Sequence, residues 1–72
     1  MEQEIEILLN GEKTVITGGL TVEGLISNLG LKRDQVAVEV NRSILKREVW
    51  GDHVLAHADV VEIVHFVGGG KE

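Results

Sequence analysis

The sequence contains no cysteine among its 72 residues. A disulfide scaffold, a thiolate zinc site and an iron–sulfur cluster are therefore excluded, and the absence fits a reducing compartment. No apolar run approaches the roughly 20 residues that a membrane-spanning helix needs. The acidic start MEQEIE also differs from the start of a signal peptide. We therefore expect a cytoplasmic protein that does not contact a membrane.

Basic residues are scarce as well, with 7 Lys and Arg against 12 Asp and Glu and a formal net charge of −5. Nucleic-acid binding depends on Lys and Arg that neutralise phosphates, so this balance argues against a nucleic-acid partner. An acidic surface suits a basic protein partner. It also keeps a small domain soluble without any partner, and the charge alone leaves both interpretations open.

Apolar residues make up 43% of the chain, mostly Val, Ile and Leu, with one Trp and one Phe. This share is ample for a globular core. A chain of this length buries only about 60% of the surface that it exposes when unfolded. We therefore expect one small domain and no second one.

The first part of the sequence predicts a β-hairpin. Residues 4–9 carry apolar side chains at alternate positions, which is typical of a half-buried strand. Asn10-Gly11 favours a type I′ turn, because both positions of that turn need residues that tolerate positive φ. Residues 13–17 form the returning strand, and the two-residue turn places Ile16 opposite Ile5.

A short amphipathic helix is predicted over residues 22–29, where apolar side chains follow the i, i+3, i+4, i+7 rule. Thr21 precedes it as N-cap, and Glu23 places a negative charge in the first turn. Gly30 suits the position directly after the helix, with Leu31 folding back on the last turn.

Three further strands follow the helix. They are predicted at residues 36–40, 43–45 and 60–67, with a turn at Asn41-Arg42 and an irregular segment with one possible helical turn at residues 46–55. Two hairpins thus flank one helix, whose single apolar stripe covers one face of the sheet. The order predicts an α+β fold, a β-grasp roll with a mixed sheet and one helix packed on one face. The domain spans residues 1–67, and residues 68–72 form a flexible tail.

Three stretches carry a family resemblance. They read AVEVN at residues 37–41, KREVW at residues 46–50 and DVVEIVHFVGGG at residues 59–70. In these stretches, and over nearly its whole length, the chain resembles the ThiS family, the small ubiquitin-like β-grasp sulfur carriers of thiamine biosynthesis. The Arg-x-x-Trp element and the aliphatic strand that runs into glycines are the most specific parts of this resemblance.

The resemblance implies a protein co-substrate with no catalytic residue, metal or bound cofactor of its own. In such carriers an E1-like adenylyltransferase uses ATP to adenylate the C-terminal glycine carboxylate. Sulfur supplied through a cysteine desulfurase then gives a thiocarboxylate, which thiazole synthase consumes. The reactive carbon would belong to Gly70. Gly68 and Gly69 would form an extended tail without side chains, able to enter the partner's channel.

The sequence departs from the family pattern at two places. Lys71 and Glu72 follow the glycines, whereas family members end at the glycine. Since an internal amide cannot be adenylated, we expect a protease to remove both residues. Lys46 stands where the family commonly has Pro, which loosens the turn and leaves the chemistry untouched.

A docking surface is predicted on the sheet face that the helix does not cover. Alternation along the first, third and last strands places apolar and acidic residues there, which suggests an apolar centre with a charged rim. The centre consists of Leu8, Val64 and Phe66, and the rim consists of Glu6, Glu39 and Glu62. We expect this face to bind both the adenylating enzyme and thiazole synthase.

Further residues and further functions have to be considered for this sequence. His53 and His57 have ligand-like spacing, but their segment lacks a third ligand, so we interpret them as surface residues. Arg47 and Trp50 are interpreted as structural. Sulfur carriers for molybdopterin synthesis or tRNA thiolation belong to the same class of proteins as the sulfur carriers of thiamine biosynthesis, and they remain alternatives. Lys71 and Glu72 leave two alternative functions open. One is a modifier that is conjugated to lysines, and the other is a β-grasp binding module that is never activated. By itself the chain is expected to be a monomer.

Overall fold

The computed structural model describes residues 3–66. The expected tail over residues 68–72 and the end of the predicted domain at residue 67 lie outside the described residues. The elements, in chain order, are β1 (Glu4–Leu9), β2 (Glu12–Thr17), α1 (Val22–Asn28), the 3-10 turn η1 (Arg33–Gln35), β3 (Val36–Val40), β4 (Ser43–Leu45), the 3-10 turn η2 (Arg47–Val49) and β5 (Val60–His65).

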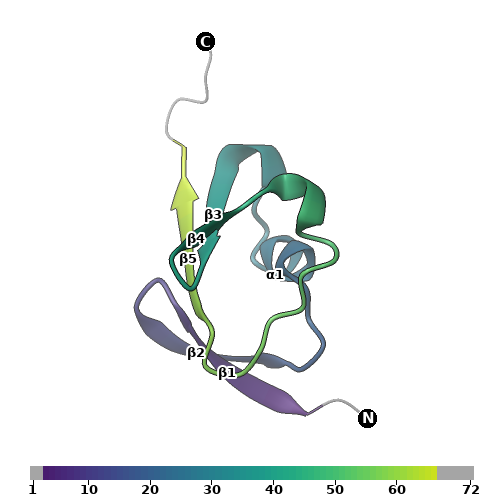
Figure 1. The fold of residues 1–72 in the computed structure, drawn as a ribbon, viewed down its shortest axis with the longest axis vertical. Coiled ribbons are helices and arrows are strands. Elements are labelled where there is room, and N and C mark those ends of the chain that lie inside the picture. Colours follow the sequence, from purple (N-terminus) through teal and green to yellow (C-terminus); the bar gives the residue numbers. More distant parts are fainter. Residues whose placement is uncertain (1–2, 67–72) are drawn as a thin grey trace.

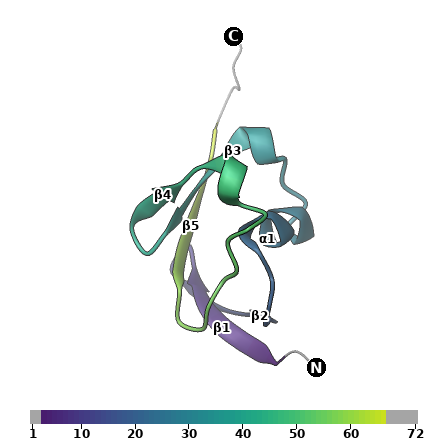
Figure 2. The ribbon, with the colours of Figure 1, turned by 45° about the vertical axis from the view of Figure 1, so that its right-hand side comes forward.

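The strands form one five-stranded sheet in the order β2-β1-β5-β3-β4. β5 lies in the centre, parallel to β1 and antiparallel to β3, and the two outer pairs are antiparallel hairpins. α1 lies on one side of this sheet, and β5 runs toward the end of the molecule from which the chain leaves the described region (Figures 1 and 2). The predicted mixed sheet with one covering helix is therefore confirmed.

Local turn chemistry explains both hairpins. Asn10 and Gly11 have φ values of 48° and 84°, as the type I′ turn requires, and Ile5 pairs with Ile16 in the predicted register. Asn41 and Arg42 repeat the same pattern with φ values of 53° and 73°. Both turns leave their flanking strands in register, so alternate side chains of each strand face the helix side.

Both ends of α1 are capped as the sequence predicts. The Thr21 hydroxyl oxygen accepts a hydrogen bond of 3.0 Å from the Gly24 amide, one of the amides that the first turn leaves without a partner. At the other end Gly30 has a φ of 73°, and the amide of Leu31 donates to the Ile26 carbonyl at 3.1 Å. This is a Schellman ending, which turns the chain back toward the sheet.

The core lies between α1 and the inner side of the sheet. Side chains from every strand except β4 are buried there with those of α1 and of the segment before β5. The buried hydrophobic residues are Ile7, Ile16, Val22, Leu25, Ile26, Val36, Val38, Val40, Trp50, Leu55 and Val61. Because one face of the sheet takes up this burial, the other face stays open. Among the described residues, no helix is long and apolar enough to cross a membrane.

Trp50 and Arg47 hold the irregular segment against the sheet, as interpreted from the sequence. Trp50 is 1% exposed, and its indole N–H donates to the Leu45 carbonyl at 2.9 Å. The Arg47 guanidinium donates to the carbonyls of Arg33 and Val36 at 2.7 and 3.0 Å. Arg33 and Arg47 also lie over the indole ring, with guanidinium carbons 5.6 and 5.7 Å from its centroid. The sequence analysis missed η1, which supplies the Arg33 carbonyl.

Replacement of Thr21 by Ala should lower the free energy of unfolding by about 1 kcal/mol, because the Gly24 amide loses its acceptor. Urea denaturation followed by the fluorescence of Trp50 measures this change. Thr21→Ser keeps the hydroxyl and serves as the control, with a stability near that of the original chain. Equal losses in the Ala and Ser variants would contradict a capping role.

Candidate functional site

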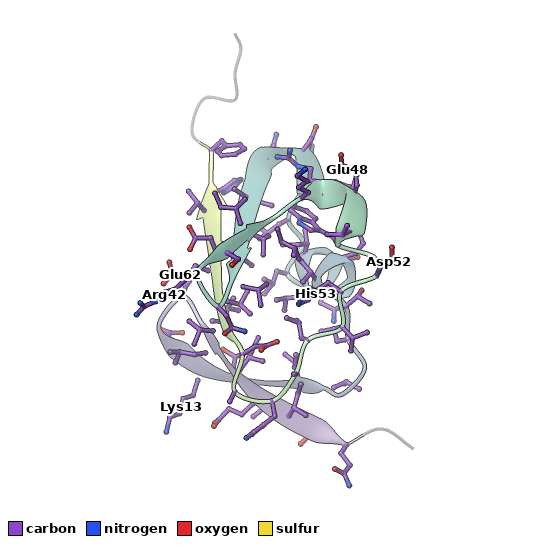
Figure 3. The ribbon with its side chains drawn as sticks, viewed as in Figure 1. Lys13, Arg42, Glu48, Asp52, His53 and Glu62 are labelled. Atoms are coloured by element: carbon purple, nitrogen blue, oxygen red, sulfur yellow. The ribbon has the colours of Figure 1, made fainter. Side chains whose placement is uncertain are left out.

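The open side of the sheet, here called the outer face, faces away from α1. Six of its hydrophobic side chains are exposed, and acidic side chains lie among them. Glu62 and Lys13 both project on this side (Figure 3). The exposed hydrophobic residues are Leu8 (36%), Val15 (60%), Ile44 (76%), Val60 (37%), Val64 (56%) and Phe66 (47%), and Val15 lies on this face because it pairs with Glu6. The predicted Leu8, Val64 and Phe66 are therefore uncovered, whereas Val15, Ile44 and Val60 were not predicted.

The strand register divides these residues into two groups. Leu8 of β1 lies beside Val60 of β5. Val64 lies beside Ala37 of β3, four residues farther along β5. That separation is about 13 Å at the rise of an extended strand. The prediction of one apolar centre that joins Leu8, Val64 and Phe66 is thus wrong in its arrangement, because it was made without knowing which residues of β5 pair with β1.

Between the two apolar groups lies a pair of carboxylates. Glu62 of β5 pairs directly with Glu39 of β3, and Glu39 in turn pairs with Ile44 of β4. The acidic side chains were predicted at the rim, and the register instead places this pair in the middle of the outer face. Glu6, on β1, is half-buried and stays at one end of the face. The roles of all these residues in partner binding remain a prediction.

A shallow hollow lies on each side of the carboxylate pair. One, of about 220 Å³, is lined by Leu8, Val60 and Lys13 among others. The second, of about 260 Å³, is lined by Ala37, Ile44 and Phe66 together with residues 45–48. Each hollow is large enough for one apolar side chain of a partner. The outer face therefore has two hollows with a pair of carboxylates between them.

The end of β5 is fixed more firmly than the sequence suggested. Beyond Val61, β1 has turned away, and the Asn10 side chain takes its place. Its Oδ1 accepts from the Ile63 amide at 2.8 Å, and its Nδ2 donates to the Ile63 carbonyl at 3.4 Å. On the other side the Phe66 amide donates to the Gln35 carbonyl at 2.9 Å. The end of β5 and the adjoining Phe66 are therefore hydrogen-bonded to both halves of the sheet.

Asn41 makes the equivalent contact at the start of β5. Its Oδ1 accepts from the Val60 amide at 2.9 Å, its own amide donates to the Val60 carbonyl at 2.7 Å, and its Nδ2 donates to Asp59 at 3.0 Å. Each hairpin turn thus contributes an Asn that binds β5. The sequence identified both residues as turn formers, but no local signal showed that their amides would also bind a distant strand.

The predicted reactive positions lie outside the described residues. These are Gly68, Gly69 and Gly70, together with Lys71 and Glu72. The structure describes the strand that precedes them in the sequence, β5, and its hydrogen bonds.

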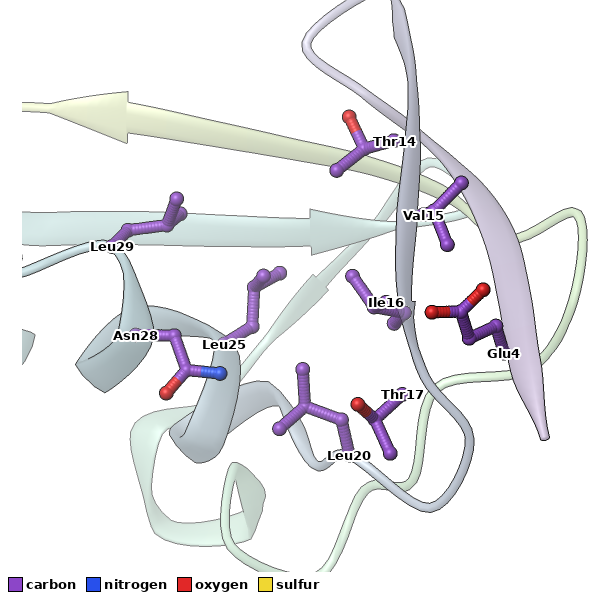
Figure 4. A pocket seen from close by; sticks show the side chains of 9 residues that line it. All are labelled: Glu4, Thr14, Val15, Ile16, Thr17, Leu20, Leu25, Asn28 and Leu29. Atoms are coloured by element: carbon purple, nitrogen blue, oxygen red, sulfur yellow. The ribbon is translucent and has the colours of Figure 1, made fainter. Parts of the chain in front are cut away.

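A further hollow of the described surface lies away from the outer face. A hollow of about 290 Å³ lies between β2 and α1, lined mainly by apolar and hydroxyl side chains such as Leu20, Leu25 and Thr14 (Figure 4). Within residues 3–66, no group of three or more His, Asp or Glu could hold a metal ion. His57, one of the two spaced histidines, accepts the Glu6 amide through Nδ1 at 3.1 Å. It extends the pairing of β1, so its role in the described region is structural.

Comparison with known proteins bears on this arrangement. The sequence model of the ThiS family matches residues 3–70. The chain belongs to the ThiS family. The sulfur carrier protein ThiS of Bacillus subtilis (strain 168) is 42% identical over 50 residues, which cover 69% of this chain and 76% of that protein.

A solved structure supports the same assignment. The crystal structure of a thiamine biosynthesis protein (ThiS) from Geobacter metallireducens has a TM-score of 0.77 and 32% sequence identity, and the match covers 92% of this chain and all of that one (100%). The fold of this ThiS-family chain is accordingly the ubiquitin-like β-grasp.

One relative is much longer than the chain. A thiazole synthase of Magnetococcus marinus (strain ATCC BAA-1437 / JCM 17883 / MC-1) is 43% identical over 67 residues, which cover 93% of this chain. The matched part is 21% of that protein, so the chain spans about a fifth of the thiazole synthase that it matches. A segment similar to this ThiS-family chain is therefore part of a protein named for the thiazole-forming reaction.

Replacement of Asn10 by Gly should loosen the end of β5 and leave the hairpin turn intact, because Gly accepts the positive φ. The Ile63 amide loses its acceptor, and its hydrogen exchange should become about fivefold faster, as expected for a hydrogen bond worth about 1 kcal/mol. Exchange measured by NMR checks this. Asn10→Asp keeps the accepting Oδ1 and should retain protection at Ile63, and similar exchange in both variants would contradict the assigned contact.

Proposed function

We propose that this chain is a sulfur carrier of thiamine biosynthesis, a protein co-substrate that other enzymes act upon. The observation that carries the proposal is the family match, which extends through Gly70, four residues beyond the last described residue, Phe66. The central position of β5 supports it, since the strand that leads to the glycines is hydrogen-bonded on both sides.

The reaction would take place at the carboxylate of Gly70. A carboxylate oxygen attacks the α-phosphorus of ATP, pyrophosphate leaves, and the product is an acyl adenylate. A persulfide formed by the desulfurase then attacks the acyl carbon through its terminal sulfur, AMP leaves, and the product is an acyl disulfide. An external thiol, as the two-electron reductant, cleaves the S–S bond, which releases the thiocarboxylate and forms a disulfide between the two thiols. The proposal requires a free carboxylate at Gly70, so it includes cleavage after this residue. It places no catalytic group, metal or bound cofactor on this chain, and the ATP is held by the activating enzyme.

The glycine tail suits this task for a physical reason. The acyl carbon must reach a nucleotide that another protein encloses, and three extended residues span about 10 Å. Gly68 and Gly69 present no side chain to the walls of such a channel and adopt any φ that it imposes. The anchored end of β5 fixes where the tail begins, which limits the region that the acyl carbon must search.

The partners in this proposal are an E1-like adenylyltransferase, a cysteine desulfurase, a protease that trims the tail, and thiazole synthase. The name of the Magnetococcus marinus relative supports the last of these. We propose the outer face as the docking surface for the adenylyltransferase and thiazole synthase, with Leu8, Val64 and Phe66 as apolar contacts and Glu6, Glu39 and Glu62 as charged ones. We place the pathway in the cytoplasm, where ATP is available.

A second candidate function shares the fold. A β-grasp module that binds a partner without activation would use the same outer face, and the residues after Gly70 favour it. Carriers for molybdopterin synthesis or tRNA thiolation would share the activation chemistry and differ only in the acceptor of the sulfur.

A chain that ends at Gly70 should support ATP–pyrophosphate exchange by the adenylating enzyme of the same organism and should gain one sulfur in place of one oxygen. Gly69→Val should lower the exchange rate about 100-fold or more, because a misplaced acyl carbon loses the geometry of attack. Exchange of labelled pyrophosphate and intact mass measure both effects. The full 72-residue chain is the control, and exchange in it equal to that of the shortened chain would contradict the need for a free Gly70.

Replacement of Val64 by Asp should raise the KM of the adenylating enzyme for the chain about tenfold, because a charge replaces an apolar contact at the proposed interface. Val54→Asp is the matched control, since Val54 is 55% exposed, close to the 56% of Val64, but lies outside the outer face. Circular dichroism verifies that both variants fold. An equal rise in KM for the two variants would exclude a specific role for the outer face.

A further inference from the structure

We propose that Glu39 and Glu62 together bind one arginine side chain of thiazole synthase, with an apolar contact of the same partner on each side. This inference deepens the proposed function, on which it rests, because it names the chemical feature that the partner must present to the outer face.

The positions of the two carboxylates favour the binding of a cation. Glu39 and Glu62 are directly opposed on neighbouring strands, and like charges so placed destabilise a sheet. Within residues 3–66 the one salt bridge joins Arg33 and Glu23, so neither carboxylate of the pair is neutralised there. Arg42, in the turn between β3 and β4, forms no ion pair with either carboxylate among the described residues. The free protein therefore carries a repulsion that a bound cation would remove.

The surroundings indicate that this cation belongs to a protein. Ile44, which is 76% exposed, lies beside Glu39, and the hollow on each side of the pair has exposed apolar side chains in its lining together with charged ones. A free ion would gain nothing from these apolar side chains. A partner surface would bury them, and its charge would meet the carboxylates where water is excluded.

Arginine fits the pair better than lysine. Its planar guanidinium carries five N–H donors, so it can donate to two carboxylates at once, whereas an ammonium group is a single point charge. The distance between Val60 and Val64 along β5 predicts the spacing of the apolar side chains on the partner. The partner would present two apolar side chains about 13 Å apart with the arginine midway between them.

The partner that we propose for this contact is thiazole synthase. A protein of that name contains a segment similar to 93% of this chain within its own sequence. In such a protein the two parts are held at high effective concentration, so a contact between them needs little affinity and depends on correct charge placement.

The test measures the affinity of the full chain for thiazole synthase of the same organism by calorimetry. We expect Glu39→Gln and Glu62→Gln each to weaken binding about tenfold. The double variant should weaken it by much less than the product of the two single fold-changes, because both carboxylates bind one cation. Glu12→Gln removes the same charge at the edge strand β2 and should stay within about twofold. In urea denaturation, each of the two central variants should be at least as stable as the original chain.

Three outcomes overturn the inference: binding by the central variants within twofold of the original chain, an equal loss in Glu12→Gln, or no binding of the original chain to thiazole synthase. Replacement of the surface arginines of thiazole synthase by lysine, one at a time, identifies the bound group. One such variant should bind weakly and be insensitive to Glu62→Gln, and the absence of any such variant also overturns the inference. Pyrophosphate exchange by the chain that ends at Gly70 reports on the proposed function separately, since it does not involve thiazole synthase.

Discussion

The described structure depends on the pairing of β5 with both β1 and β3. The hairpins β1–β2 and β3–β4 form from residues close in sequence, and β5 is the strand through which the described sheet joins them. Val61 is fully buried and pairs with Leu9 on one side and Val40 on the other. If β5 left this position, two isolated hairpins would remain, and such hairpins are marginally stable in water.

The same pairing places every feature of the candidate site. The parallel register with β1 puts Leu8 beside Val60, and the antiparallel register with β3 puts Glu62 beside Glu39. A shift of one residue along β5 would turn Glu62 and Val64 into the core and bring Val61 and Ile63 out to solvent. The buried face of β5 thus fixes the arrangement of its exposed face.

The sequence predicted what depends on local chemistry. The ranges of β1, β3 and β4, the Asn10-Gly11 turn, the Thr21 cap and the Gly30 ending were all confirmed, because alternation, positive φ and capping involve neighbours in the chain. The family and the β-grasp fold were also correct. The arrangement of the outer face was wrong in part, since alternation tells which face a residue occupies but not which residue of another strand lies beside it. The side-chain contacts of Asn10 and Asn41 with β5 were missed for the same reason, and η1 was missed because three residues give no periodic signal.

A small domain can carry an unfavourable charge pair only where other contacts compensate for it. Opposed like charges cost a few tenths of a kcal/mol to about 1 kcal/mol, a noticeable share of the roughly 5–15 kcal/mol that keep a domain folded. At the other end of the described structure, Arg47 and Arg33 donate to backbone carbonyls and lie over the buried Trp50, whose indole N–H donates to the Leu45 carbonyl. The local contacts are thus favourable around Trp50, where the chain only needs to fold. They are unfavourable between the two carboxylates of the outer face, where we expect a partner to bind. Such a contrast is typical of a functional surface. In the ThiS-family chain it points to Glu39 and Glu62, which β5 and β3 hold together in the absence of any attraction between them.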